Sequence, residues 1–515
     1  MSEGIVLTAF SRTKAKLDLS DAATKLMETG GDGRIAVDPA TGFNRYMVAP
    51  RPSDVLAYSS STANDISPAA FAEVQRRLAQ LAPDLALSAQ QYRDALGGLR
   101  TRLRAALRLP GSTRIVFAAS GTDLEYVGLA VAHRVDTAGI DNILLGADEI
   151  GSGCGQSAQG RFFADRTPIG LSVAPATPIR VQGGIDVRLV NVPVRGPGGT
   201  AVPSEDLLLE IAAAASAAIA AGRHPLIHVV HGSKTGLILP SFAHIDALRR
   251  RFGQRLSFVV DACQCRLGDA AIAAYLARGA TVFLTGSKFM GGPPFSGIAL
   301  IPQSAASASA GIPPGFDQIF HRAEWPDDWL KADRLREGAN LGLLLRLEAS
   351  IYELELFQKL GAADIRRTLD LFDESVDSLT RRLGAARVLP HAAGEWQEAR
   401  SHPLEMRTLV TIDLSQTEDP LDFDRAAVLH RMLFQPLGRA TANAAERAVA
   451  NRRIRLGQPV RCVPLPAGGF GGTLRLGLSM PQMVEFAGMD TLSLRSRLTS
   501  DMTAIAEKID IIRDL

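Results

Sequence analysis

The chain has 515 residues, of which 46% are hydrophobic and 21% charged, as in globular proteins with one large domain and one or two smaller ones. Its 56 lysine and arginine residues nearly balance 54 aspartate and glutamate residues, so the formal net charge is only +2. Because charges of one sign form no block, this composition argues against a surface built for nucleic acid or an anionic membrane.

The first residues lack the continuous apolar core of a secretory signal, and the most apolar helical stretch, 207–221, is shorter than the ~20 residues that a membrane span needs. We therefore expect a soluble, cytoplasmic protein. Four cysteines (Cys154, Cys263, Cys265 and Cys462) are too few for a disulfide framework, and the spacing of Cys263 and Cys265 does not suit zinc. We expect free thiols and no metal.

Two amphipathic helices are predicted at residues 68–83 and 88–107, and alternating strand and helix patterns follow. The predicted strands are short runs rich in Val, Ile and Leu, at 113–118, 142–146, 186–192, 225–231, 256–261, 280–285 and 297–301. Helical patterns occupy 122–135, 204–222, 244–252 and 270–279. This order predicts an α/β fold, a three-layer sandwich with a mainly parallel sheet between two layers of helices.

One connection is too short for a parallel pair. Only GSKFMGGPPFS separates the strands at 280–285 and 297–301, which leaves no room for a crossover helix. These two strands should be antiparallel, and the sheet is therefore mixed.

The remainder of the chain predicts a smaller α+β domain. Residues 338–383 have an almost wholly helical pattern, followed by strands near 407–414 and 472–478 and helices near 423–434 and 490–515. We divide the chain into an N-terminal helical segment (1–110) that packs on the small domain, a large α/β domain (111–345) and the small α+β domain (346–515).

The first predicted strand ends in ASGTDLE (119–125), a turn of small residues that opens a helix. Such a turn offers free backbone N–H groups to an anion, and the helix dipole adds a favourable potential. Gly121 permits close approach, and Thr122 adds a hydroxyl donor. The alternative is a simple helix cap by Ser120 or Thr122.

Three further strand ends carry polar residues, and in open α/β sheets ligands bind outside the carboxyl ends of the strands. Asp261 ends one apolar strand, Lys288 follows another, and Ser233 lies in a glycine-framed loop after a third. A surface aspartate capping the next helix is the alternative for Asp261. Lys234 is a competing lysine, which we expect to be exposed.

An anion-binding turn, an aspartate and a lysine at one sheet edge are together what pyridoxal phosphate requires. The lysine amine forms an imine (Schiff base) with the aldehyde of this cofactor and, once released, acts as a base. The aspartate keeps the pyridine nitrogen protonated, so that the ring can accept electrons. Lys288 follows Asp261 by 27 residues (288 − 261). One helix and one strand fit in this interval, so the two side chains come back to the same edge of the sheet.

The runs VVDACQ and FLTGSKFMGGPPFSGIALI resemble the cofactor-binding core of fold-type I pyridoxal-phosphate enzymes, in the class V aminotransferase and cysteine desulfurase group. The resemblance covers roughly residues 110 to 345. It implies that Asp261 binds the pyridine nitrogen, Gln264 the ring hydroxyl, and Lys288 the aldehyde. It also implies phosphate contacts from Gly121, Thr122, Thr285 and Ser287, and a place near the ring for Ser233.

Two later segments extend the resemblance. REGAN (336–340) is similar to a segment that reaches the cofactor phosphate of the neighbouring subunit, although Ala339 replaces the usual threonine, so that Asn340 is the substitute. TLRLGLSM (473–480) resembles the strand whose arginine binds the substrate carboxylate, a role that falls to Arg475, whose planar fork suits a carboxylate. The alternative for Arg475 is an ion pair with a surface acid.

The sequence departs from the group in two places. Residues 146–153, GADEIGSG, contain no aromatic residue to stack on the cofactor ring. Cys462 is the only cysteine between Lys288 and Arg475, and its RCVPLP context does not suggest the exposed, acidic thiol that a desulfurase needs.

These features predict a pyridoxal-phosphate-dependent enzyme that acts on an amino acid or small amine, with Lys288 as proton shuttle. Aminotransferase-like chemistry is preferred, and a lyase or decarboxylase of the same fold is the alternative. A non-catalytic α/β cofactor-binding protein is the alternative from another class. By the resemblance we also expect a homodimer.

Overall fold

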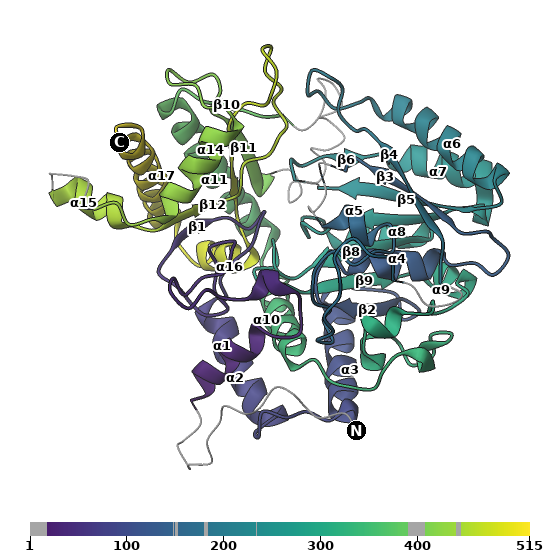
Figure 1. Ribbon diagram of the computed structural model, residues 1–515. Coiled ribbons are helices and arrows are strands. Elements are labelled where there is room, and N and C mark those ends of the chain that lie inside the picture. Colours follow the sequence, from purple (N-terminus) through teal and green to yellow (C-terminus); the bar gives the residue numbers. More distant parts are fainter. Residues whose placement is uncertain are drawn as a thin grey trace.

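The computed structural model describes residues 18–147, 149, 153–179, 184–232, 234–389, 407–438 and 444–515. Its large sheet and the helices around it lie beside a smaller lobe that contains the C-terminus (Figure 1). In chain order the described elements are α1 (Leu19–Met27), η1 (Gly33–Ile35), β1 (Leu56–Tyr58), α2 (Pro68–Leu81), α3 (Ala89–Ala106), β2 (Arg114–Ala118), α4 (Leu124–Ala132), β3 (Ile140–Leu145), α5 (Cys154–Ser157), β4 (Val187–Val192), α6 (Ser204–Ala220), β5 (His224–His231), β6 (Ile238–Leu239), α7 (Phe242–Phe252), η2 (Gly253–Arg255), β7 (Ser257–Asp261), α8 (Asp269–Ala277), β8 (Ala280–Thr285), β9 (Gly297–Ile301), α9 (Gln303–Ala308), η3 (Phe316–Gln318), η4 (Arg322–Glu324), η5 (Ala332–Arg334), α10 (Leu341–Phe357), α11 (Ala362–Arg382), β10 (Ala386–Arg387), β11 (Leu409–Asp413), α14 (Phe423–Phe434), α15 (Ala444–Asn451), β12 (Ile454–Leu456), β13 (Thr473–Gly477), α16 (Met480–Ala487) and α17 (Thr491–Arg513).

The large sheet is mixed, as predicted. Its strands follow the order β2-β9-β8-β7-β5-β3-β4, with β6 paired to β5. Strands β8, β7, β5, β3 and β4 are mutually parallel, whereas β9 is antiparallel to both β8 and β2. The antiparallel pair predicted from the short GSKFMGGPPFS connection is confirmed.

Helices cover both faces of this sheet, because alternate residues of its strands pack into different hydrophobic clusters. In β8, Val282 and Leu284 pack into the cluster that contains α3, α6, α7 and α8. Phe283 points to the other face and packs with α4. Strands that bury both faces carry unbroken apolar runs, and the three-layer α/β sandwich is thereby confirmed.

The C-terminal lobe is smaller and contains an antiparallel sheet of order β10-β11-β13. Helix α11 contacts β10 and α14 contacts β13, and both α16 and α17 pack against α11. The N-terminal segment meets this lobe directly, because β1 pairs with β12 in parallel. Helices α1, α2 and α3 pack on α10, which joins the two parts of the chain. Figure 1 shows α1 and α2 beside α10 at the base of the smaller lobe.

The predicted elements of the large domain match the observed ones closely. The strands at 280–285 and 297–301 coincide with β8 and β9, and the other predicted strands of this sheet differ only at their ends. The long helical pattern at 338–383 is two helices, α10 and α11. The short strands β1, β6, β10 and β12 were not predicted, because two or three residues carry no measurable period. Helix α1, of nine residues, was also not predicted.

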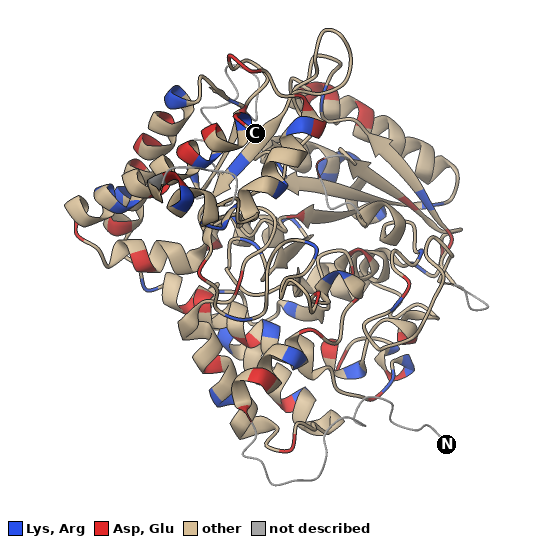
Figure 2. Ribbon diagram, turned by 60° about the vertical axis from the view of Figure 1, so that its left-hand side comes forward, with Lys and Arg blue, Asp and Glu red and all other residues tan. Residues whose placement is uncertain are grey.

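Charged residues of both signs are interspersed over the elements (Figure 2), in keeping with the small net charge. Within the described ranges, no helix combines the length and the apolar character needed to cross a membrane.

A buried carboxyl group joins α3 to the segment after β9. Glu324 accepts hydrogen bonds from Tyr92 Oη (3.1 Å) and from the backbone N–H of His321 (2.9 Å). Burial raises the pKa of Glu324 to about 8, so the folded protein keeps a proton here that the unfolded chain loses near pH 4.5. The folded state therefore loses stability as the pH rises from about 4.5 to 8.

Glu324→Gln should remove this pH dependence, since the amide stays neutral. The quantity to compare is the free energy of unfolding of the variant minus that of wild type. We expect this difference to be larger at pH 8 than at pH 5 by on the order of 4 kcal/mol, because only wild type loses stability over this range. Denaturant titrations of both proteins at the two pH values would measure the difference. An unchanged difference between the two pH values would contradict the prediction.

Candidate active site

A cavity of about 520 Å³ opens at the carboxyl ends of β5, β7 and β8, where the strands end in His231, Asp261 and Thr285. Its walls come from the large sheet, from the N-terminal segment and from the small domain. The lining residues are Arg34, Tyr46, Ser61, Thr62, Ser120, Gly121, Thr122, Glu149, Cys154, His231, Lys234, Asp261, Cys263, Gln264, Thr285, Ser287, Lys288, Phe295, Phe423, Gln458, Pro459, Val460, Arg461 and Arg475.

Most of the residues singled out in the sequence meet in this cavity. Those that line it are Gly121, Thr122, Asp261, Gln264, Thr285, Ser287, Lys288 and Arg475. Asn340 does not line it, and its role toward a neighbouring subunit stays a prediction. Ser233 lies outside the described residues.

The turn before α4 is shaped for close approach. A Cβ atom on Gly121 would lie only 2.7 Å from Thr285 Cγ2 and 3.3 Å from Cys263 Sγ. Ser120 closes the turn, since its hydroxyl accepts a hydrogen bond from the Asp123 N–H and donates to the Asp123 carboxylate; the N-cap of α4 is Asp123, which makes no side-chain cap hydrogen bond. The Thr122 hydroxyl makes no such cap and faces the cavity, so the turn retains a donor for an anion.

Asp261 ends β7, and Gln264 lies in the loop that follows it. The Asp261 carboxylate accepts a hydrogen bond from the Cys263 N–H (3.0 Å). Gln264 Nε2 donates to the Ser61 carbonyl oxygen (3.1 Å), whereas Gln264 Oε1 and Ser61 Oγ have no hydrogen-bond partner within the described part of the chain. Buried polar atoms are normally paired, so these two atoms indicate a polar ligand in the cavity.

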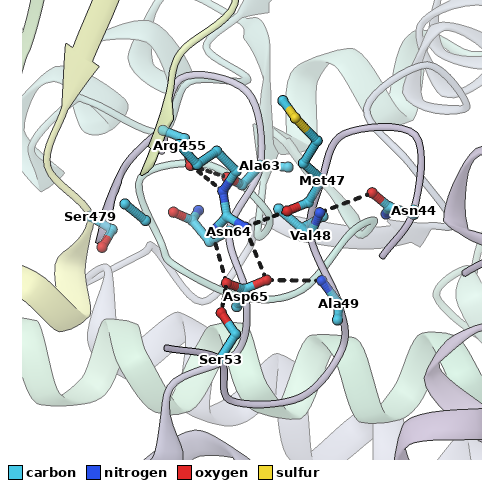
Figure 3. Close-up of polar contacts among 12 residues, drawn as sticks. Asn44, Met47, Val48, Ala49, Ser53, Ala63, Asn64, Asp65, Arg455 and Ser479 are labelled. Atoms are coloured by element: carbon cyan, nitrogen blue, oxygen red, sulfur yellow. Dashed lines mark hydrogen bonds and ion pairs between the residues drawn. The ribbon is translucent and has the colours of Figure 1, made fainter. Parts of the chain in front are cut away.

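The backbone of Lys288 is held by the N-terminal segment. Asn64 Nδ2 donates to the carbonyl oxygens of Ser287 (3.0 Å) and Lys288 (2.7 Å). Next to Asn64, the Asp65 carboxylate binds the Arg455 guanidinium at 2.9 Å and accepts a hydrogen bond from the Ala49 N–H (Figure 3). The buried Asp65–Arg455 pair therefore ties the segment that contacts Lys288 to β12.

Asp65→Asn should destabilise the fold by about 3 kcal/mol, because it leaves the Arg455 guanidinium buried without a counter-charge. Chemical denaturation would measure the loss. The matched control is Asp54→Asn at an exposed position of the same segment, for which we expect a change within about 0.5 kcal/mol. Equal effects of the two substitutions would contradict this role for Asp65.

Arg475 on β13 is buried, and its guanidinium binds only neutral oxygen atoms. It donates to the carbonyl oxygens of Gln458 (2.8 Å) and Lys234 (3.1 Å) and to Thr62 Oγ1 (3.2 Å). None of the ion pairs among the described residues includes it, so the alternative of a surface acid partner has no support here. A buried arginine without a carboxylate suits an anionic ligand.

Lys234 is not the exposed residue that we expected. It is partly buried and lines the cavity, where burial and then Arg475 lower its pKa. Its backbone holds it there, since the Lys234 N–H donates to the Glu149 carbonyl oxygen and Arg475 Nη1 donates to the Lys234 carbonyl oxygen.

Behind Asp261 lies a buried acid–histidine pair. Asp261 pairs with Val230 of β5. Since residues two apart on a strand point to the same face, His228 lies on the same sheet face as Asp261. Glu125 Oε2 lies 3.3 Å from His228 Nε2. Burial lowers the pKa of His228 to about 4 and, with the nearby Asp261, raises that of Glu125 well above its usual value. His228 is therefore neutral at pH 7 and gives Asp261 no counter-charge, while the raised pKa of Glu125 favours its uncharged form.

The four cysteines have thiols that resist ionisation. Cys154, Cys265 and Cys462 are buried and Cys263 is partly buried. Burial raises the pKa of every one of them, to about 12 for Cys265 and about 11 for Cys462. Cys154 and Cys263 line the cavity as small polarizable groups.

Sequence reasoning missed the residues that the N-terminal segment brings to the cavity, namely Arg34, Tyr46, Ser61 and Thr62. A local signal for Arg34 exists in GGDGR (30–34), where glycines frame an Asp-x-Arg turn. The aromatic rings that line the cavity are Tyr46, His231, Phe295 and Phe423, so the described part of the segment after β3 supplies none.

Comparison with solved structures identifies the fold. The chain is similar to the apo cysteine desulfurase of Thermococcus onnurineus NA1, with a TM-score of 0.51 and 14% identity over 87% of this chain and 95% of that one. It is also similar to ureidoglycine–glyoxylate aminotransferase of Bacillus subtilis, with a TM-score of 0.50 and 12% identity over 90% and 98%. No family model matches the sequence, and no curated protein does.

The chain therefore has the fold of the fold-type I pyridoxal-phosphate enzymes, which these two proteins share. At 12–14% identity, this likeness establishes the architecture, whereas the chemistry resides in the residues of the cavity.

Proposed function

We propose that the protein is a pyridoxal-phosphate-dependent enzyme that acts on an amino acid or small amine, with aminotransferase-like chemistry. The observation that carries the proposal is the meeting of Lys288, Asp261 and the Gly121–Thr122 turn in one cavity. These groups match the aldehyde, the pyridine nitrogen and the phosphate of the cofactor. The unpaired Gln264 Oε1 and the closely packed Gly121 fit the same ligand.

When bound, pyridoxal phosphate supplies an aldehyde for covalent attachment and a ring that accepts electrons. Lys288 Nζ would hold the aldehyde carbon and, once displaced by the substrate amine, would take the proton from the substrate Cα. Asp261, oriented by the Cys263 N–H, would face the pyridine nitrogen. The Thr285 hydroxyl donates to the Cys263 carbonyl oxygen (2.6 Å) and would have to turn to donate to a phosphate.

Arg475 would bind the substrate carboxylate. Its buried guanidinium contacts carbonyl and hydroxyl oxygens, so a carboxylate would bring the missing negative charge. Desulfurase chemistry is disfavoured, because a persulfide-forming thiol needs a lowered pKa and burial raises the pKa of Cys462 to about 11. By analogy with this fold we also propose a homodimer.

The test is an absorbance titration of purified protein with pyridoxal phosphate, followed by a panel of amino acids and amines. We expect a visible band that bleaches with one class of amine, and release of the corresponding carbonyl product, an oxo acid from an amino acid or an aldehyde or ketone from a simple amine. A product formed by elimination or decarboxylation would favour a lyase. A protein that binds pyridoxal phosphate but leaves every amine unchanged would overturn the enzymatic proposal.

A further inference from the structure

Arg34 contacts the anion-binding turn directly. It lies in η1, in the segment that precedes β1, and it lines the cavity. Its Nη1 donates to Thr122 Oγ1 (3.2 Å) and its Nη2 to Ser120 Oγ (3.3 Å). These two hydroxyls flank Gly121, so the guanidinium lies at the rim of the turn to which the cofactor phosphate was assigned.

The guanidinium is held by one carboxylate and by two aromatic rings. Asp32 binds it in a bidentate pair, with distances of 2.7 Å to Nε and 2.8 Å to Nη2. The rings of Phe163 and Phe295 lie 4.9 and 5.1 Å from Cζ. A planar cation fixed in this way loses little conformational freedom when it binds an anion.

Helix α10 fixes the segment that carries Arg34. Arg346 donates to the carbonyl oxygens of Met27 (2.7 Å), Thr29 (2.6 Å) and Gly30 (3.1 Å), and also to that of Phe295 (2.7 Å). The same arginine therefore positions Arg34 and one of the rings that contact it.

Asn340 adds a second tether between α10 and this segment. Its Nδ2 donates to the Gly30 carbonyl oxygen (2.9 Å), and its Oδ1 accepts from the Leu343 N–H. Gly30 has φ +66°, and a Cβ atom there would lie 1.7 Å from Asn340 Oδ1. Only glycine fits at this position. In this chain, Asn340 supports the N-terminal segment instead of lining the cavity.

We propose that Arg34 is a phosphate-binding residue that the N-terminal segment contributes to the cofactor site of the same chain. This inference rests on the proposed function. Arg34 occupies one side of the turn, the N-terminus of α4 lies at its base, and Thr285 and Ser287 line the cavity with it. A phosphate in the turn would accept hydrogen bonds from the Thr122 hydroxyl and the Arg34 fork.

The experiment compares Arg34→Ala with wild type in three titrations of the apoprotein: with pyridoxal phosphate, with pyridoxal and with inorganic phosphate. We expect the affinities for pyridoxal phosphate and inorganic phosphate to fall about 10- to 100-fold, as for loss of a charge-assisted hydrogen bond. The affinity for pyridoxal, which lacks the phosphate, should not change. Absorbance follows the two aldehydes, and calorimetry follows phosphate.

The matched control is Arg45→Ala, an exposed arginine of the same segment, which should leave all three affinities unchanged. Arg34→Lys keeps the charge without the planar fork. It should lose less affinity for pyridoxal phosphate and inorganic phosphate than Arg34→Ala, and this graded loss would separate a phosphate contact from a folding defect. Equal loss of pyridoxal and pyridoxal phosphate binding, or no loss of either, would overturn the role of Arg34. Failure of the wild-type protein to bind pyridoxal phosphate would instead overturn the proposed function.

Discussion

Lys288→Ala should lower the rate of turnover by at least about 10³-fold, because one amine provides both the covalent attachment and the proton transfer. The variant should still fold. The contacts from Asn64 go to the backbone carbonyls of Ser287 and Lys288, and these remain after truncation of the side chain. Steady-state rates with the amine found in the titrations, beside denaturant unfolding, would measure both effects.

Lys234→Ala is the matched control, since Lys234 lines the same cavity. It should alter substrate affinity while the rate of the chemical step at saturating substrate stays within about 10-fold of wild type. If Lys234→Ala abolished turnover and Lys288→Ala did not, the assignment of the two lysines would be reversed.

Arg346→Met should produce the largest loss of stability, about 3–5 kcal/mol. The guanidinium is fully buried, and burial lowers its pKa to about 10. Methionine would fill part of the space but leave the carbonyl oxygens of Met27, Thr29 and Phe295 without this donor. Since the same bonds position Arg34, the affinity for inorganic phosphate should fall as well.

Chemical denaturation would measure this effect, with Arg366→Met on the exposed face of α11 as control, expected within about 0.5 kcal/mol of wild type. Arg346→Lys keeps the charge but makes fewer hydrogen bonds. Its loss of stability should lie between that of Arg346→Met and that of Arg366→Met. A loss below about 1 kcal/mol for Arg346→Met would contradict this role of Arg346.

The large domain could be predicted from sequence because its signals are local. Strands covered on both faces carry unbroken apolar runs, and the eleven residues between Thr285 and Gly297 force an antiparallel pair. Asp261 and Lys288 could be placed at one edge because both follow the carboxyl ends of parallel strands. The Gly121 turn could be placed at the same edge from its strand end, whereas Gln264 was assigned through the family resemblance.

The contribution of the N-terminal segment could not be predicted in the same way. Arg34 reaches the turn of α4 through contacts with Asp32, Phe163 and Phe295, and the last two lie far away in the sequence. The tethers from α10 to residues 27–30 span more than 300 residues. Neither periodicity nor composition reports such packing, and the inward position of Lys234 was missed for the same reason.

The most direct test of the account is borohydride reduction of the protein with bound pyridoxal phosphate, followed by peptide mass spectrometry. Reduction makes the attachment to a lysine permanent and so identifies the residue. The account predicts a phosphopyridoxyl group on Lys288 and none on Lys234. Modification of Lys234 instead, or of no lysine in the cavity, would contradict it.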